Sequence, residues 1–233
     1  MHLFYAPHIA LSHELPVDEA AHALRVLRLQ PGDEVNLTDG QGCFYRARIS
    51  ECNRKRCLVE VEEKEKQAPL WKGHLHIALA PTKNMDRMEW LAEKATEIGF
   101  DELTFLNCQW SERHIVKGER IEKILVSAMK QSLKARLPKL NEMTEFTRFV
   151  KQPFNGQKFI AHCHEGDKQL LRQALQPDQD ALVLIGPEGD FTPAEVDEAI
   201  KQGFTPVSLG NTRLRTETAA LVAVHLMNLT HST

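Results

Sequence analysis

The apolar residues of the first 70 positions follow the spacing of β-strands. Apolar and polar residues alternate in three short segments, 35–37, 44–49 and 57–61. Asp39-Gly40 separates the first two segments, and an Asp-Gly turn between alternating segments is a strong signal for a β-hairpin. A helix is expected over 17–29, because Pro31-Gly32 ends its apolar spacing. Short strands joined by tight turns predict a small β-barrel.

The pattern changes after a charged stretch, 62–67, which is followed by Pro69 and is interpreted as a linker. Beyond it, short apolar runs alternate with segments of helical spacing. Strands are expected over 74–80, 101–106, 159–161, 181–185 and 206–209, and helices over 85–98, 121–133, 193–203 and 216–229. Alternating strands and helices predict a mainly parallel sheet covered by helices. We therefore expect two domains, 1–70 and 71–233.

Composition narrows the class of protein. Hydrophobic residues make up 42% of the chain and charged residues 26%, which is typical of a soluble globular protein. No apolar run approaches the roughly 20 residues that span a bilayer, and residues 1–15 lack the pattern of a signal peptide. The five cysteines form no C-x-x-C motif, which argues against a disulfide framework or a zinc ribbon. A cytoplasmic protein without metal or membrane contact is expected.

The net charge of −3 gives no sign of a nucleic-acid partner, but the charge is unevenly spread. The segment 113–139 holds eight lysines and arginines and only two acidic residues, Glu119 and Glu122. Such a local excess can bind a polyanion whatever the total charge. From charge alone, a solvated helix face is the favoured interpretation of this segment.

A glycine-rich loop follows the apolar strand 181–185. Its sequence is Gly186-Pro187-Glu188-Gly189-Asp190-Phe191, and the next helix opens with a Thr192-Pro193-Ala194-Glu195 capping box. Glycine lets backbone groups approach a ligand closely. The loop is neither a P-loop nor a G-x-G-x-x-G dinucleotide loop. Taken alone, a tight turn is as good an interpretation as a ligand loop.

A second polar loop runs from the last strand into the last helix. It places Arg213, Arg215, Glu217 and two threonines within a few residues. Helix capping explains Thr216 and Glu217. It does not explain two arginines before a helix N-terminus, where the helix dipole disfavours positive charge. Because ligands bind at the carboxyl ends of strands in open α/β sheets, both loops are candidates for one site.

These loops and several other segments resemble the ribosomal RNA small subunit methyltransferase E family, S-adenosylmethionine-dependent enzymes of the SPOUT class. The resemblance covers nearly the whole chain. Its weaker motifs are 22–28 with Pro31-Gly32-Asp33, Lys83 with 86–90 and 94–99, and Gln131-Ser132 with Leu137-Pro138. Its strongest motifs are 186–191 and 214–219, each specific and correctly spaced.

The resemblance implies an α/β fold in which a C-terminal SPOUT domain with a trefoil knot, a mainly parallel sheet with flanking helices, follows a small PUA-like β-barrel. It implies S-adenosylmethionine as cofactor and a homodimer with the active site close to the subunit interface. Apolar walls with a few amide and carbonyl partners suit an adenine ring. The residues expected at the cofactor are His162, Ile185, Gly186, Pro187, Glu188, Gly189, Leu209, Gly210, Leu214 and Thr216.

The implied reaction is methyl transfer to N3 of a uridine in small-subunit ribosomal RNA, as naked RNA or within an assembled subunit. Arg215 is expected to stabilise negative charge on the uridine imide, with Arg213 second. Glu217 is expected to orient the arginine or the substrate; the sequence identifies no general base. The residues expected to hold RNA phosphates are Arg25, Arg28, Lys83, Arg87, Lys130, Lys134 and Arg136.

Three departures from the family pattern bear on this reading. Asp190 stands where a third glycine is usual, Thr212 where an arginine is common, and Leu133-Lys134 where Gly-Arg is usual. A non-catalytic RNA-binding or ribosome-assembly protein therefore remains an alternative, as does the same enzyme class with another RNA target. The cluster His162-Cys163-His164-Glu165 invites a metal-site interpretation, but it lacks the second ligand cluster that such a site needs.

Overall fold

The structure is a computed structural model that describes residues 2–53 and 56–232. It forms two compact units. The first contains the chain up to Pro69 together with Val126–Leu137, and the second contains Leu70–Leu125 and the chain from Pro138 onward. The sequence analysis placed 126–137 in the second domain, whereas the structure groups this segment with the first unit. Among the described residues, no helix has the length and apolar character needed to cross a membrane.

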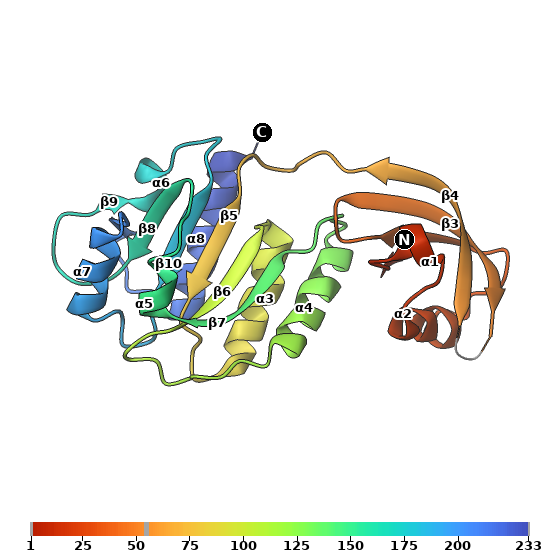
Figure 1. Cartoon of the computed structure of the whole chain (residues 1–233), viewed down its shortest axis with the longest axis horizontal. Coiled ribbons are helices and arrows are strands. Elements are labelled where there is room, and N and C mark those ends of the chain that lie inside the picture. The colour runs from red at the N-terminus through yellow and green to blue at the C-terminus, as the bar shows by residue number, and fades with distance from the viewer. Residues whose placement is uncertain (1, 54–55, 233) are drawn as a thin grey trace. The chain divides into compact units, whose positions relative to one another are not determined.

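The first unit is a curled four-stranded sheet with order β1-β2-β3-β4 (Figure 1). Its elements are β1 (Leu3–Tyr5), α1 (Ile9–Ser12), α2 (Val17–Ala21), the π-helical turn η1 (His22–Val26), β2 (Glu34–Thr38), β3 (Cys43–Cys52) and β4 (Cys57–Lys66). Strand β1 is parallel to β2, and the other pairs are antiparallel. Glu14 bridges Leu58 of β4. The short chain segment from β1 to Glu14 thus joins the two edges of the sheet, as expected for a small barrel.

The helix predicted over 17–29 ends earlier than expected. It consists of α2 and η1, and Arg28 then adopts a left-handed backbone with φ 58°. Phe4, Ile9, Leu37 and Ile49 pack in the core of this unit and are almost fully buried.

The linker predicted over 62–67 is wrong, because β4 continues to Lys66. The charged residues of this stretch face solvent and pair with basic residues across the sheet. Arg46 lies 3.0 Å from Glu63, and Arg48 lies 3.0 Å from Glu62. Consecutive charged residues, exposed on both faces at the end of an edge strand, therefore resemble a linker in the sequence.

The second unit is a seven-stranded sheet with order β7-β6-β5-β10-β8-β11-β9. All of its strand pairs are parallel, which confirms the predicted fold class. Its elements are β5 (Leu75–Leu79), α3 (Met85–Ile98), β6 (Glu102–Asn107), α4 (Gly118–Gln131), β7 (Lys139–Glu145), α5 (Phe146–Phe149), β8 (Gln157–Ala161), β9 (Gln169–Leu170), α6 (Leu171–Ala174), β10 (Ala181–Ile185), α7 (Pro193–Lys201), β11 (Thr205–Ser208) and α8 (Thr216–His231). Helix α4 begins in this unit and ends in the first.

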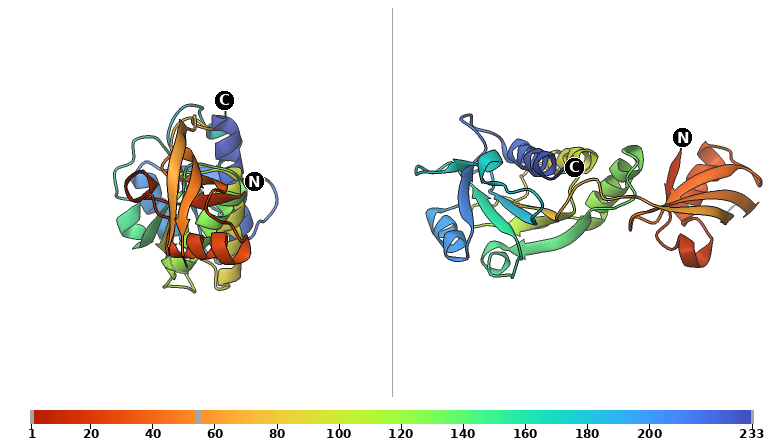
Figure 2. Two further views of the ribbon diagram at one scale, coloured as in Figure 1. Left: turned by 90° about the vertical axis from the view of Figure 1, so that its right-hand side faces the viewer. Right: turned by 90° about the horizontal axis from the view of Figure 1, so that it is seen from above.

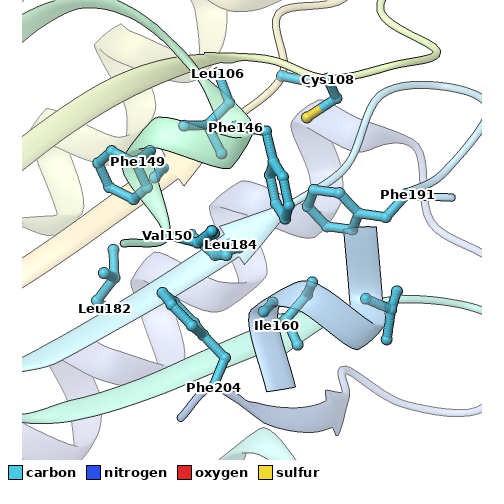
Figure 3. Close-up of a cluster of buried hydrophobic side chains, with 14 residues drawn as sticks. Leu106, Cys108, Phe146, Phe149, Val150, Ile160, Leu182, Leu184, Phe191 and Phe204 are labelled. Atoms are coloured by element: carbon cyan, nitrogen blue, oxygen red, sulfur yellow. The ribbon is translucent and has the colours of Figure 1, made fainter. Parts of the chain in front are cut away.

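Helices cover both faces of the sheet, with α3 and α8 on one face and α5 and α7 on the other (Figure 2). Leu182 and Leu184 of the central strand β10 pack with Phe146 and Phe191 in one buried cluster (Figure 3). Helix α8 packs against β5, β10 and α3. The threading of α8 through a loop, implied by the family resemblance, stays a prediction.

Local sequence signals set the helix ends near the site. Asn84 accepts a hydrogen bond from the Asp86 amide at 2.9 Å and begins α3. Gly99 ends α3 with φ 120°. The predicted capping box of Thr192 and Glu195 is present at the start of α7.

Candidate functional site

A cavity of about 730 Å³ opens at the carboxyl ends of β8, β10 and β11 in the second unit. It is lined by the loops that follow these strands and by the first turn of α8. Every residue predicted for catalysis or cofactor binding lines it, with one exception, Gly189. The structure therefore brings together two loops that the sequence could only suggest as neighbours.

Gly186 is the position in the first loop where backbone approaches backbone most closely. A Cβ added there would lie 3.0 Å from the Phe191 amide nitrogen and 3.1 Å from the Asp190 carbonyl carbon. At Gly189, an added Cβ would make only ordinary contact, 3.6 Å from Cβ of Trp110. Tight packing within the loop is thus found at Gly186 and not at Gly189, and the expected approach of these glycines to a ligand stays a prediction.

Asp190 ties this loop to the segment that follows β8. Its backbone is left-handed with φ 68°, a conformation in which glycine is favoured and Asp is tolerated. One carboxylate oxygen accepts the Cys163 amide at 2.7 Å, and the other accepts the Phe191 amide at 2.8 Å. This geometry accounts for the departure from glycine: the carboxylate adds two hydrogen bonds that glycine lacks.

His162 lies directly after β8 and lines the cavity. Both of its ring nitrogens are buried and have no hydrogen-bond partner among the described residues. Burial, with the nearby Lys168 ammonium, lowers the pKa of this imidazole to about 4. The ring is therefore neutral near pH 7, with one donor and one acceptor for a ligand. The Lys168 ammonium donates to the carbonyl oxygens of His162 and His164.

The second loop combines a glycine turn with two arginines. Gly210 adopts φ 139°, and its amide donates to the Ser208 hydroxyl at 3.2 Å. Arg213 and Arg215 are exposed and line the cavity. Within residues 2–53 and 56–232, neither guanidinium forms a hydrogen bond or an ion pair. Arg215 occupies the N-cap position of α8 without capping it through its side chain. Both cations are thus available to an anionic or polar ligand.

Glu217 is buried in the first turn of α8 and faces Arg87 of α3. Its Oε1 atom lies 3.6 Å from an Arg87 nitrogen, while its Oε2 atom is buried with no partner in the described chain. Arg87 was predicted to hold RNA, but it lines the cavity beside this carboxylate. A buried acceptor that lacks a donor is costly, so Glu217 is poised to accept a hydrogen bond from a ligand.

Comparison with known proteins identifies this architecture. Residues 69–228 match the family described as RNA methyltransferase domain, and residues 15–62 match the RNA methyltransferase PUA domain. The curated relatives that match most of the chain are named ribosomal RNA small subunit methyltransferase E, one of them at 32% identity. The chain belongs to this family. This confirms the family that the sequence motifs suggested.

Named relatives and solved structures agree with this family. The chain is 28% identical to the ribosomal RNA small subunit methyltransferase E of Rickettsia conorii, over 93% of this chain and 89% of the relative. It is 32% identical to the one of Synechocystis, over 88% and 68%. A crystal structure of a probable rRNA-methyltransferase from Porphyromonas gingivalis superimposes with a TM-score of 0.93 at 46% identity, covering 99% and 98% of the two chains. The Neisseria gonorrhoeae family member, solved bound to S-adenosyl methionine, gives 0.83 at 28% identity, covering 98% and 97%.

The family's predicted RNA contacts are unequally available. Arg25, Arg28 and Arg136 of the first unit are exposed. Lys134 is only 9% exposed, and Lys130 is 2.5 Å from the buried Glu19. To bind RNA, Lys134 would have to leave its buried position and Lys130 would have to break its ion pair with Glu19.

Lys83 of the second unit is exposed, and its ammonium is 3.0 Å from Glu112. Leu133, one of the departures noted in the sequence, has a left-handed backbone with φ 52°, a conformation that glycine adopts more readily than leucine.

Sequence reasoning missed several residues of this site. Lys168 and Ser208 line the cavity, and neither belongs to a recognisable motif. The pairing of Arg87 with Glu217 joins residues 130 positions apart, for which one sequence carries no signal. The metal-site interpretation of the residues around His162 finds no support. The described residues contain no group of three or more histidine, cysteine, aspartate or glutamate side chains placed to hold an ion.

Proposed function

We propose that this family member transfers the methyl group of S-adenosylmethionine to N3 of a uridine in small-subunit ribosomal RNA. The observation that carries the proposal is a single cavity in which glycine-containing loops meet two unpaired arginines and a buried acceptor, Glu217. The names of the relatives support the RNA substrate, and the cofactor named for two solved family members supports S-adenosylmethionine.

The residues of the cavity suit an adenosyl group. Ile185, Leu209 and Leu214 supply apolar walls, and the loops supply backbone amides and carbonyls. The two unpartnered ring nitrogens of His162 are matched to a ligand that both donates and accepts hydrogen bonds. At Gly186, a side chain would press against Asp190 and Phe191 of the same loop, so glycine keeps this loop closely packed. With Pro187, Glu188, Gly210 and Thr216, these residues form the proposed cofactor site.

The bound cofactor supplies an electrophilic methyl group. The chain's own task is to hold the uridine in line and to favour loss of its imide proton. Arg215 donates to the imide oxygens and stabilises the negative charge that develops there, with Arg213 in support. Glu217, held near Arg87, positions the substrate by accepting a hydrogen bond. No base is assigned, because no group in the cavity has a geometry that singles it out.

Exposed cations of both units hold the RNA backbone in this proposal. They are Arg25, Arg28 and Arg136 in the first unit and Lys83 in the second. Such contacts give affinity that falls with salt but carry no sequence information. The burial of Lys134 and the ion pair of Lys130 remove these residues from the set. Ribosomal subunits are located in the cytoplasm, so we propose that the protein acts there.

The protein is further proposed to act as a homodimer. Helix α8 supports this, because Val222, Leu226 and Leu229 share one face of the helix and are not buried in this chain. Leu229 is 63% exposed. An apolar stripe of this kind is covered when a second copy packs against it. Sedimentation of the purified protein measures the oligomeric state.

Methyl transfer to small subunits that lack the modification tests the function. Subunits are purified from a strain without this protein and incubated with radiolabelled S-adenosylmethionine, and the modified nucleotide is mapped by mass spectrometry. The proposal expects one N3-methyluridine in the small-subunit RNA. Cofactor binding is measured separately by calorimetry, and no binding at millimolar S-adenosylmethionine would contradict the enzymatic assignment in favour of a non-catalytic RNA-binding protein.

A further inference from the structure

Trp110 is an exposed aromatic residue at the margin of the candidate site. It lies in the turn that follows β6, and 48% of its surface is accessible. Its side chain is adjacent to Gly189, where an added Cβ would lie 3.6 Å from Cβ and 3.7 Å from Cε3 of the tryptophan. The residues on either side of Gly189, Glu188 and Asp190, both line the cavity. The indole is therefore next to the cofactor loop without belonging to the cavity wall.

The turn that carries Trp110 is anchored on both sides. Cys108 is buried in the core cluster with Phe146 and Phe191 (Figure 3). The buried Ser111 closes the turn, because its hydroxyl accepts the Cys108 amide at 2.9 Å and its own amide donates to the Cys108 carbonyl at 3.0 Å. The Gln109 amide donates to Glu195 in the capping box of α7 at 2.8 Å. A rigid turn thus holds an apolar ring in solvent, which packing alone does not require.

Hydrogen bonds join this turn to the cofactor loop through basic residues. Glu188 accepts the Lys83 amide at 2.9 Å, and the Lys83 carbonyl accepts two bonds from the Arg113 guanidinium at 3.1 and 2.6 Å. The Lys83 ammonium is 77% exposed and pairs with Glu112 at 3.0 Å. A surface ion pair of this kind is weak and exchanges readily for a phosphate contact. An aromatic face and the exposed Lys83 ammonium therefore lie at the same margin of the site.

We infer that Trp110 is a stacking platform for an unpaired RNA base beside the uridine that enters the cavity. The inference rests on the proposed function, since it names how that substrate is held. Proteins recognise RNA in single-stranded regions by stacking splayed bases on aromatic side chains. A tryptophan offers the largest such face, and rigid presentation lowers the entropy lost when the base docks. Lys83 then meets the phosphate of the stacked nucleotide.

Substitutions at Trp110 separate stacking from packing. Trp110→Ala should raise the dissociation constant for small-subunit RNA roughly 10- to 100-fold, the scale for losing one stacked base. Trp110→Phe should keep most of the affinity, whereas Trp110→Leu, apolar but without a π face, should behave as Trp110→Ala. Cofactor affinity should change little in all three. Trp90→Ala removes a similarly exposed tryptophan (44%) from α3 and is the matched control.

Indole fluorescence gives a readout that does not depend on methyl transfer. RNA should quench the wild-type protein more than the Trp110→Phe variant, because a stacked base quenches the indole. Equal RNA affinity for Trp110→Ala and wild type would overturn the inference, as would equal affinity for the Phe and Leu variants. If the wild-type protein transfers no methyl group to ribosomal RNA but this RNA still quenches Trp110, the proposed function is wrong and the stacking role of Trp110 is supported.

Discussion

Polar side chains are satisfied at one end of the strands of the large parallel sheet and left unsatisfied at the other. We call these ends the amino edge and the carboxyl edge of the sheet. At the amino ends of β5, β6 and β7, Glu102 accepts hydrogen bonds from His74 at 2.7 Å, Asn141 at 2.6 Å and Lys139 at 3.0 Å. His76 bonds Thr104 in the same network. At the carboxyl ends of β8, β10 and β11, the described residues leave both ring nitrogens of His162 and one oxygen of Glu217 buried without a partner.

This difference separates stability from function. Buried polar groups are normally satisfied, and an unsatisfied one costs about 1–3 kcal/mol. The satisfied network at the amino edge contributes to the stability of the unit. The unsatisfied groups at the carboxyl edge are explained when a ligand completes them. Substitutions at the carboxyl edge should therefore change activity and affinity, and substitutions at the amino edge should change the free energy of unfolding.

The largest effect is expected at Arg215. Its guanidinium lines the cavity and makes no hydrogen bond or ion pair within the chain as described, so its removal should leave the fold intact. Arg215→Ala should lower single-turnover methyl transfer roughly 100- to 1000-fold, the scale for losing one charge-stabilising donor. Cofactor affinity should change much less. Arg215→Lys should recover part of the rate, since an ammonium cannot make a bidentate contact.

A thermal melt alongside the rate measurement is the control for Arg215. Normal activity in folded Arg215→Ala protein would remove this residue from the mechanism. A parallel loss of stability and activity would make it a structural residue instead.

Gly186 should show the next largest effect, on cofactor affinity. In Gly186→Ala the new Cβ would press against backbone atoms of Asp190 and Phe191 at about 3 Å, so the loop must shift. A strained loop of this kind should weaken S-adenosylmethionine binding roughly 10- to 100-fold. Gly189→Ala is the matched control, because its Cβ finds only ordinary contacts. Calorimetry measures both affinities. Equal losses of cofactor affinity in the two variants would show that the close packing at Gly186 is not the cause.

The sequence predicted the parts of this site that depend on local spacing. The strand 181–185 and the helix 85–98 have the predicted bounds, because a buried central strand and an amphipathic helix followed by glycine have clear patterns. The edge strand β7 was missed, since its half-exposed residues show no apolar run. The charges of 62–66 were misread for the same reason at the edge of the small sheet.

Long-range contacts were the other part that the sequence could not supply. Asp190 bonds the Cys163 amide across 27 positions, and Glu217 meets Arg87 across 130. Helical charge patterning also cannot tell which lysines of 113–139 are exposed, and Lys134 proves to be buried. The rule that ligands bind at the carboxyl ends of parallel strands suggested one site for both loops, but it could not supply the contacts within that site.

At the amino edge, Glu102 should affect stability and not cofactor binding. Glu102→Gln removes the charge that His74 and Lys139 meet and should cost about 1–3 kcal/mol in the free energy of unfolding. Equilibrium denaturation in urea measures the change, with S-adenosylmethionine affinity as the contrasting readout. A variant that loses cofactor affinity but not stability would contradict the division between the two edges.

The same network predicts a pH dependence of stability. The hydrogen bond from His74, with those from Asn141 and Lys139, lowers the pKa of Glu102, so its contribution is present above about pH 4.3 and is lost as the pH falls. Glu102 raises the pKa of His74, so that contribution is complete below about pH 6.5 and is lost as the pH rises. Denaturation curves should therefore show reduced stability above neutral pH, and His74→Gln should remove most of that slope.

The smallest effect is expected at His162. Because burial holds the pKa of its imidazole near 4, the ring stays neutral from pH 8 down to about pH 5. A neutral ring that makes one hydrogen bond to the cofactor contributes about 0.5–1.5 kcal/mol. His162→Ala should therefore weaken S-adenosylmethionine binding about 2- to 10-fold, by the same factor at pH 8 and pH 6. His114→Ala, which removes an exposed histidine bonded to Asn107, should leave the affinity unchanged. Should His162→Ala bind as tightly as wild type, its ring nitrogens are buried for a reason other than the cofactor. A loss that grows steadily as the pH falls from 8 to 6 would instead show that the wild-type ring binds the ligand in its protonated form.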